Sequence, residues 1–319
     1  MPNRFPVTAV TGAAGYIGTL LLYELEKEED LPLITALDVN PLRLPVRNVV
    51  SVRHDVTHPL DQVIRDRNID TVVHLAFNFG HGTYSREDRI IQEGNLSGLS
   101  NVLKACHAGK VANLIYVSSY TVYGAYKDNP IPITEESPMR PLPGFQYSYL
   151  KWLSESMIRS FSDENPDIRI TVLRPSVVLG PTANNMITDA LFQRIFLGIA
   201  GYNPPMQFVH ENDLARLLCL LVREPHSGIF NVAGERVVHY RKLATLSQRK
   251  PLIMPSPVAN ALTALAWKTG IQKHSSPVGL DFIRYPILIS TGKLKKETGF
   301  RFRYTSEDAL MSYLMGRPI

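Results

Sequence analysis

The sequence predicts an α/β protein in which a parallel sheet is covered by helices on both faces. Short apolar and β-branched runs alternate with longer amphipathic runs, and a glycine-rich turn follows the first predicted strand. Hydrophobic residues make up 45% of the 319 residues and charged residues 20%, an ordinary globular composition. We therefore expect a sizeable core that forms without disulfides or structural metals.

In the first half of the chain, predicted strands alternate with predicted helices. The predicted strands cover residues 7–11, 33–38, 49–53, 71–75, 114–118 and 169–173. The predicted helices cover residues 16–28 and 86–107, with a third from about residue 146. Five prolines between residues 128 and 143 predict an irregular loop before that third helix.

The first strand runs into a turn with three regularly spaced glycines. Gly12 permits the tight turn, Gly15 lets the backbone approach a pyrophosphate, and Gly18 lets helix and strand pack closely. Such glycines also occur for purely structural reasons. Here, however, Asp38 ends the next strand about 20 residues past the last glycine, which completes the dinucleotide-binding fingerprint. We therefore expect a Rossmann-type doubly wound parallel sheet.

The residues after the second and third strands bear on which dinucleotide binds. The Asp38 carboxylate can accept hydrogen bonds from the adenosine ribose hydroxyls and would repel a 2′-phosphate, which favours NAD. Arg43 could reach such a phosphate and keeps NADP open. Asp55 and Val56 are candidates to contact the adenine, although an aspartate at a strand end is often a turn former.

Tyr147 and Lys151 stand at i and i+4 on a predicted helix, so their side chains project from one face. A lysine ammonium beside a phenol lowers its pKa from about 10, which would let Tyr147 exchange a proton with substrate near neutral pH. A solvated helix face can carry the same pair. The hydroxyl-rich run 118–123 nevertheless lies at the carboxyl end of a parallel strand, where open α/β sheets bind ligands.

Motifs along nearly the whole chain resemble the extended short-chain dehydrogenase/reductase family, which includes NAD-dependent epimerases and dehydratases. They are the glycine string, His74-Leu75-Ala76, Asn95, Ser118-Ser119 with Val122-Tyr123-Gly124, Tyr147 with Lys151, Arg174-Pro175 with Gly180-Pro181, and Phe208 to Ala215. The resemblance implies that Ser119 hydrogen-bonds the reacting oxygen, that Tyr147 is the catalytic acid/base, and that Lys151 holds the nicotinamide ribose. The residues implied in binding NAD are Gly12, Gly15, Tyr16, Ile17, Gly18, Asp38, Asp55, Val56, Leu75, Ala76, Tyr147, Lys151 and Pro175.

The residues after the catalytic serine look more like those of 4-epimerases than of dehydratases. Sugar dehydratases of the family carry an Asp-Glu pair where this chain has Tyr120 and Thr121. The resemblance therefore implies reversible hydride transfer between NAD and a sugar nucleotide.

Two other functions stay open. Family members that bind sugar nucleotides usually present an arginine where this chain has Met206 and Gln207. A dehydrogenase or reductase of a less polar alcohol or ketone, sterol-like or flavonoid-like, is therefore an alternative. A non-catalytic dinucleotide-binding sensor or scaffold is a hypothesis of another class.

The candidates for substrate contact are His81, Ser119, Tyr120 and Arg284. Arg284 could supply the missing positive charge, or it could be an ordinary surface residue. The apolar stretch 258–271 could line a lipophilic pocket, cover the cleft, touch a membrane surface, or pack as a core or dimer-facing helix.

We assign residues 1–175 to an NAD-binding domain, to which residues 207–232 return, and residues 176–319 mainly to a smaller C-terminal substrate-binding lobe. Cys106 and Cys219 lie in predicted helices and indicate buried reduced thiols, and no ligand spacing indicates a metal site. The net charge of +5 comes without a basic block that would bind nucleic acid. We expect a cytoplasmic protein with no integral membrane segment, and the family implies a homodimer.

Overall fold

The structure is a computed structural model that describes residues 5–43, 45–80, 86–184, 188, 191–192, 196–270 and 277–316. Within that part of the chain, the main sheet has seven strands, all parallel, in the order β11-β6-β5-β4-β1-β2-β3. Their bounds are β1 Thr8–Thr11, β2 Ile34–Asp38, β3 Val49–Arg53, β4 Thr71–His74, β5 Asn113–Val117, β6 Arg169–Pro175 and β11 Gly228–Val232. The strand order reverses between β1 and β4, and doubly wound sheets bind ligands at such a switch point.

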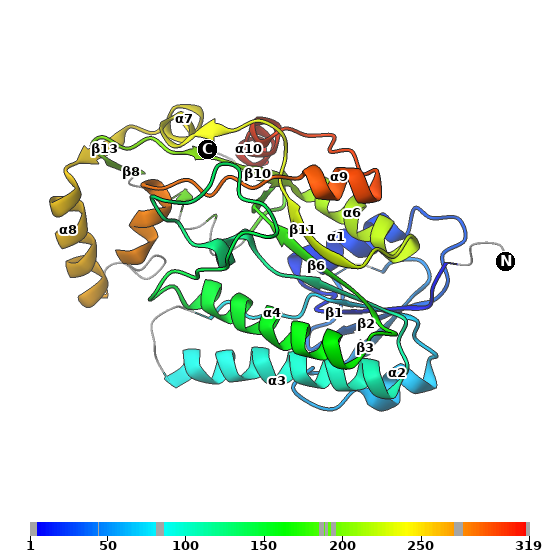
Figure 1. Cartoon of the computed structure of the whole chain (residues 1–319). Helices are drawn as coiled ribbons and strands as arrows, with labels where there is room; N and C mark the ends of the chain where they lie inside the picture. Colours follow the sequence, from blue (N-terminus) through cyan, green and yellow to red (C-terminus); the bar gives the residue numbers. More distant parts are fainter. Residues whose placement is uncertain are drawn as a thin grey trace.

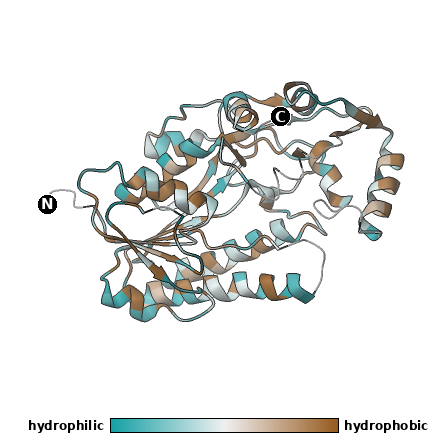
Figure 2. Ribbon diagram, turned by 180° about the vertical axis from the view of Figure 1, so that it is seen from behind, coloured by the Kyte–Doolittle hydropathy of each residue, from teal (hydrophilic) through white to brown (hydrophobic). Residues whose placement is uncertain are grey.

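Helices cover both faces of this sheet (Figure 1). One layer holds α1 (Tyr16–Leu25) and α6 (Glu211–Arg223), and the other holds α2 (Asp61–Asp66), α3 (Arg86–Ala108) and α4 (Gln146–Glu164). Hydrophobic and hydrophilic residues alternate along these helices, as expected when one face packs on a sheet (Figure 2).

Both faces of the central strands are apolar, because each face lies under a helix layer. Neighbouring strand residues therefore belong to opposite cores: Val10 and Val73 pack with α1 and α6, whereas Ala9 and Val72 pack with α2 and α3. This arrangement explains why the strands appear in the sequence as nearly continuous apolar runs.

Most of the predicted strand and helix boundaries lie within two residues of those observed, and two larger differences are the end of α1 and the presence of α2. Helix α1 ends at Leu25, short of the predicted end at residue 28, and Glu26, Glu28 and Glu29 follow it. Acidic side chains are unfavourable at the negative end of a helix dipole, which accounts for the earlier stop. Helix α2 was not predicted, because six residues are too few to show a helical period.

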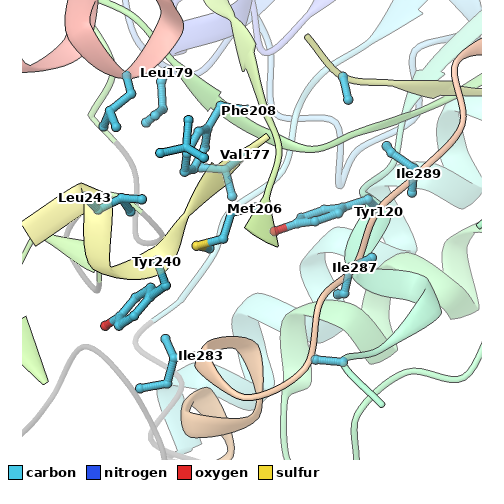
Figure 3. Close-up of a cluster of buried hydrophobic side chains, with 14 of the residues drawn as sticks. Tyr120, Val177, Leu179, Met206, Phe208, Tyr240, Leu243, Ile283, Ile287 and Ile289 are labelled. Carbon is cyan, nitrogen blue, oxygen red and sulfur yellow. The ribbon is translucent and has the colours of Figure 1, made fainter. Parts of the chain in front are cut away.

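The remaining elements build a second apolar core beside the carboxyl ends of the sheet strands. Figure 3 shows part of it, with Tyr120, Met206, Ile287 and Ile289 in the same cluster. Its strand pairs and helices are β7 (Val177–Leu179) with β10 (Phe208–His210), β8 (Phe196–Ile199) with β13 (Pro251–Met254), β9 (Pro205–Met206) with β12 (Val238–His239), η1 (Tyr120–Tyr123), α7 (Tyr240–Leu246), α8 (Ser256–Lys268), η2 (Pro277–Ile283) and α10 (Ser306–Met315).

The segment that follows β9 connects the two cores. Strand β10 pairs with β7 outside the main sheet, whereas α6 packs on α1 and β11 forms the edge of the main sheet beside β6. Helix α9 (Gly292–Thr298) packs on β11, so the chain crosses back to the large sheet late in the sequence.

The proline-rich loop 128–143 is tied down at two places. The Ser290 N–H donates to the Ile133 carbonyl at 2.8 Å, and the Arg140 N–H donates to the Val122 carbonyl at 2.9 Å. The two cysteines are buried and free. Among the described residues, no helix is long and apolar enough to cross a membrane, and no group of His, Cys, Asp and Glu side chains could hold a metal ion.

Candidate active site

A cleft with about 930 Å³ of empty space, part of it open to solvent, lies at the carboxyl ends of β1, β4, β5 and β6. Most of the residues that the sequence singled out line it together. They are Gly12, Gly15, Tyr16, Ile17, Gly18, Leu75, Ser119, Tyr120, Tyr147, Lys151 and Pro175. The predicted residues that do not line it are Asp38, Asp55, Val56, Ala76 and Arg284, and His81 lies outside the described residues.

Gly12 and Gly18 leave no room for side chains in the glycine turn. Gly12 has a φ of +70°, and a Cβ there would come within 2.6 Å of the Ala76 nitrogen. A Cβ on Gly18 would come within 2.7 Å of the Ala13 Cα. Gly15 caps α1 and lines the cleft, so the N-terminus of this helix opens onto the cleft. This backbone cradle fits the diphosphate of a dinucleotide, because free N–H groups at a helix start favour an anion.

Asp38 lies at the end of β2, next to that turn. The Ala14 N–H donates to its Oδ2 at 3.0 Å, and the Asn40 N–H donates to its Oδ1 at 2.9 Å. Two backbone donors thus hold the carboxylate beside the glycine turn, and each of its oxygens can accept a further hydrogen bond.

Asp55 and Val56 follow β3 but face different surroundings. The Thr57 N–H donates to Asp55 Oδ1 at 2.9 Å, and this backbone hydrogen bond holds the pKa of the carboxyl below its usual value. The Val56 side chain packs against α3 at Gly98. It lies so close that a Cβ on Gly98 would come within 2.8 Å of it.

Tyr147 lies in an aromatic enclosure at the start of α4. The Phe79 ring stacks on it at 5.0 Å between centroids, and Phe77 and Phe145 meet it edge-on at 5.6 and 6.0 Å. Burial raises the pKa of Tyr147 to about 12, although the hydrogen bond with the Ser119 side chain opposes the rise. The predicted lowering of this pKa is therefore not what the structure shows, since desolvation outweighs the stabilisation of the phenolate.

Lys151 lies one helical turn from Tyr147, with its ammonium 5.9 Å from the phenol ring centroid. It donates to the Val117 carbonyl at 2.8 Å and lies 4.0 Å over the Phe77 ring. Burial lowers the pKa of Lys151 to about 7, and the charge of Glu155 opposes this shift. The amine is therefore close to its switch between charged and neutral forms at physiological pH.

The two serines after β5 have separate partners. Ser119 caps η1, and its Oγ accepts from the Thr121 N–H at 3.2 Å and from the Thr121 hydroxyl at 2.9 Å. The Ser118 hydroxyl instead donates to the Glu155 carboxylate at 2.5 Å. Of the two hydroxyls, the one with the hydrogen bond to Tyr147 is that of Ser119.

A buried ion pair fixes α4 against β6 behind the cleft. Arg174 binds Glu155 at 2.6 Å, with both side chains almost wholly buried. Arg174 also donates to the Tyr123 hydroxyl at 2.7 Å, and Tyr123 donates to Asn231 at 2.8 Å. Glu155 stands two turns after Tyr147 on the same helix, so this network positions the face that carries Tyr147 and Lys151.

Several residues that line the cleft were not predicted from the sequence, among them Phe77, Phe79 and Ser176. Ser176 is buried, and its hydroxyl has no hydrogen-bond partner within the described protein. A buried hydroxyl without a partner is unusual and is one of the few unsatisfied polar groups of the described protein. Its signal in the sequence is its place directly after Pro175, at the end of a parallel strand.

Asn95, on α3, holds the segment that carries the two phenylalanines. Its Oδ1 accepts from the Asn78 N–H at 2.8 Å, and its Nδ2 donates to the Asn78 carbonyl at 2.8 Å. Asn78 stands between Phe77 and Phe79, so this amide clamp positions both rings that touch Tyr147.

Arg284, a predicted substrate residue, and Gln207, which stands where family members that bind sugar nucleotides usually have an arginine, are both engaged elsewhere. Arg284 pairs with Asp281 at 2.8 Å and donates to the side chains of Ser256 and Asn260, which ties η2 to α8. The Gln207 side chain bonds the backbone of Ile289, with its Oε1 accepting from the N–H at 2.8 Å. Neither residue lines the cleft.

The described geometry agrees with comparisons to known proteins. The model of the NAD dependent epimerase/dehydratase family matches residues 8–233. This chain therefore belongs to that family of enzymes, which confirms the predicted resemblance, the Rossmann-type fold and NAD as the cofactor.

Relatives extend over nearly the whole chain. An uncharacterized protein of Mycobacterium tuberculosis is 26% identical over 324 residues, covering 99% of this chain and 85% of the relative. The UDP-glucose 4-epimerase of Azospirillum brasilense is 28% identical over 310 residues, covering 80% of this chain and 84% of its own length. Among solved structures, that of MoeE5 in complex with UDP-glucuronic acid and NAD has a TM-score of 0.75 at 21% identity and covers 97% of this chain and 98% of its own.

Proposed function

We propose that this enzyme interconverts epimers of a sugar nucleotide at a carbon that bears a hydroxyl, as a 4-epimerase does, with Tyr147 as the acid/base. The observation that carries the proposal is the contact between the Tyr147 phenol and the Ser119 hydroxyl on the wall of the cleft, with Lys151 one turn away. The similarity to the UDP-glucose 4-epimerase of Azospirillum brasilense supports the substrate class.

The chain's own residues would divide the work. NAD, when bound, accepts a hydride from the substrate carbon and can return it. Tyr147 takes the proton of the substrate hydroxyl and gives it back, and Ser119 hydrogen-bonds the same oxygen. The aromatic rings exclude water from the phenol, and a charged Lys151 stabilises its deprotonated form.

The cofactor would extend from the glycine turn across the cleft. The N-terminus of α1 at Gly15 would hold the diphosphate, Asp38 would take the adenosine ribose, and Lys151 the nicotinamide ribose.

A second candidate is a dehydrogenase or reductase of a less polar alcohol or ketone. The aromatic wall formed by Phe77, Phe79 and Phe145 around Tyr147 favours it, as does the apolar Met206 ahead of β10. A thermal-shift titration with UDP-glucose in the presence of NAD separates the two: stabilisation by the sugar nucleotide favours the epimerase, and none favours the second candidate.

Replacement of Tyr147 by phenylalanine tests the proposal. Because only the transferable proton is lost, we expect turnover of UDP-glucose to fall at least about a hundredfold, while NAD affinity stays within about threefold. Tyr149→Phe, on the exposed side of the same helix, is the matched control and should keep its activity. A fully active Tyr147→Phe enzyme would refute the proton-transfer role, and a wild type with no turnover of any sugar nucleotide or alcohol would favour a dinucleotide sensor.

A further inference from the structure

Helix α8 presents an apolar stripe to solvent. Val258, Leu262 and Leu265 are between 46% and 59% exposed, and they lie within about 60° of arc on one face of the helix. In the whole helix the one buried residue is Ala259. An apolar stripe is normally buried, so this helix lacks cover among the described residues of the chain.

Strand β13 continues the apolar surface at the same end of the molecule. Leu252 and Ile253 are 52% and 45% exposed, and the chain runs from this strand directly into α8. Both elements lie at the outer edge of the C-terminal part, away from the main sheet (Figures 1 and 2). We call the five exposed residues of α8 and β13 the apolar face.

The segment of sequence that carries the apolar face is rich in positive charge. Residues 236–285 contain eight lysines and arginines against one acidic residue, whereas the rest of the chain has 26 basic residues against 28 acidic. Lys250, directly before β13, and Lys268, at the end of α8, are exposed at the two ends of the face. The excess of basic over acidic residues thus falls in the segment that carries the apolar face.

We propose that the apolar face docks on an anionic phospholipid surface, with α8 lying in the plane of the interface. An exposed apolar stripe flanked by lysines is the pattern of an interfacial helix, since the apolar side chains enter the acyl boundary and the ammonium groups meet the lipid phosphates. A second copy of the chain would bring the same positive charge against itself, which opposes that alternative.

Helix α8, which carries most of the apolar face, is connected to the cleft through packed elements and aromatic rings. Helix α8 packs on η2, whose Phe282 meets Phe145 edge-on at 5.1 Å, and Phe145 meets Tyr147 at 6.0 Å. These contacts link α8 to Tyr147 on the wall of the cleft.

Co-sedimentation with vesicles tests the proposal on the full chain. We expect the wild type to pellet with phosphatidylcholine vesicles that contain phosphatidylglycerol, and much less with phosphatidylcholine alone or at high salt. Leu262→Gln/Leu265→Gln should stay in the supernatant. Lys250→Gln and Lys268→Gln should each weaken binding about fivefold. The matched controls are Leu33→Gln, an equally exposed leucine before β2, and Lys104→Gln on α3, and both should bind like the wild type.

Because the substituted side chains are exposed, the variants should keep the wild-type circular dichroism and melting temperature. The proposal is overturned if the wild type does not pellet with the anionic vesicles, or if Leu262→Gln/Leu265→Gln pellets as well as the wild type. A wild-type dimer that this double substitution dissociates, without any vesicle binding, would assign the face to a second copy and equally overturn the proposal.

Discussion

Lys151 shows how two opposing effects set the charge of a single buried group. Burial among Phe77, Tyr116 and Tyr147 favours the neutral amine, while the nearby Glu155 carboxylate favours the ammonium, and burial dominates. Its i+4 spacing from Tyr147 could be predicted, but the sign of the pKa shifts could not. Spacing along a helix fixes which groups are neighbours, and desolvation depends on the rings that other segments bring in.

The shifted pKa of Lys151 makes stability depend on pH. Between about 7, its pKa in the folded protein, and the ordinary 10.5, the unfolded chain binds a proton that the folded chain does not. The free energy of unfolding therefore rises with pH in this window. We expect the wild type to gain up to about 1 kcal/mol per pH unit relative to Lys151→Met between about pH 7 and pH 9, measured by urea denaturation.

The exposed Lys104→Met serves as the control for this measurement, because it removes a positive charge without removing a buried one. It should show no such slope relative to the wild type. A stability difference between the wild type and Lys151→Met that stays constant over this pH range would contradict the assignment of a lowered pKa.

At the scale of elements, α4 and α3 position the reactive groups in different ways. Helix α4 carries Tyr147, Lys151 and Glu155 on one face, and the ion pair of Glu155 with Arg174 fixes that face against β6. Helix α3 acts through the loop after β4, where Asn95 bonds the backbone of the neighbouring segment. The first arrangement follows partly from spacing, whereas the second depends on a contact between segments that no local pattern encodes.

The Asn95 clamp leads to a prediction about the loop after β4. Asn95→Ala leaves the backbone groups of Asn78 to water, which costs about 1 kcal/mol, and loosens Phe77 and Phe79. We expect faster amide hydrogen exchange across residues 77–80 and several-fold lower turnover with a nearly unchanged melting temperature. Ser97→Ala, which removes a hydroxyl bonded within α3 itself, is the control. Equal exchange in the two variants would show that the clamp does not hold the loop.

For the whole molecule, the parallel sheet and the position of the cleft at the carboxyl ends of its strands were predictable. Each strand appears in the sequence as a short apolar run, and the glycine turn as a regular spacing of glycines. The C-terminal part was not predictable, because its strand pairs join residues far apart, such as β8 with β13, and its prolines interrupt any period. Arg284 illustrates the difference: its charge was visible in the sequence, but its partners on α8 were not. The assignment of residues 176–319 to a substrate lobe stays a prediction, as does the homodimer.

The proposed function requires above all that a dinucleotide lies against the glycine turn, within reach of Tyr147. Calorimetric titration with NAD of the wild type and of Gly15→Val tests this directly, because a valine side chain there would project into the cleft without a forbidden backbone angle. We expect the wild type to bind one NAD per chain, and Gly15→Val to bind at least about tenfold more weakly. Its melting temperature should fall by only a few degrees, since the new Cβ would lie 3.0 Å from the Gly12 carbonyl oxygen. Equal NAD affinity in the two proteins, or no NAD binding by the wild type, would contradict a dinucleotide site at the glycine turn.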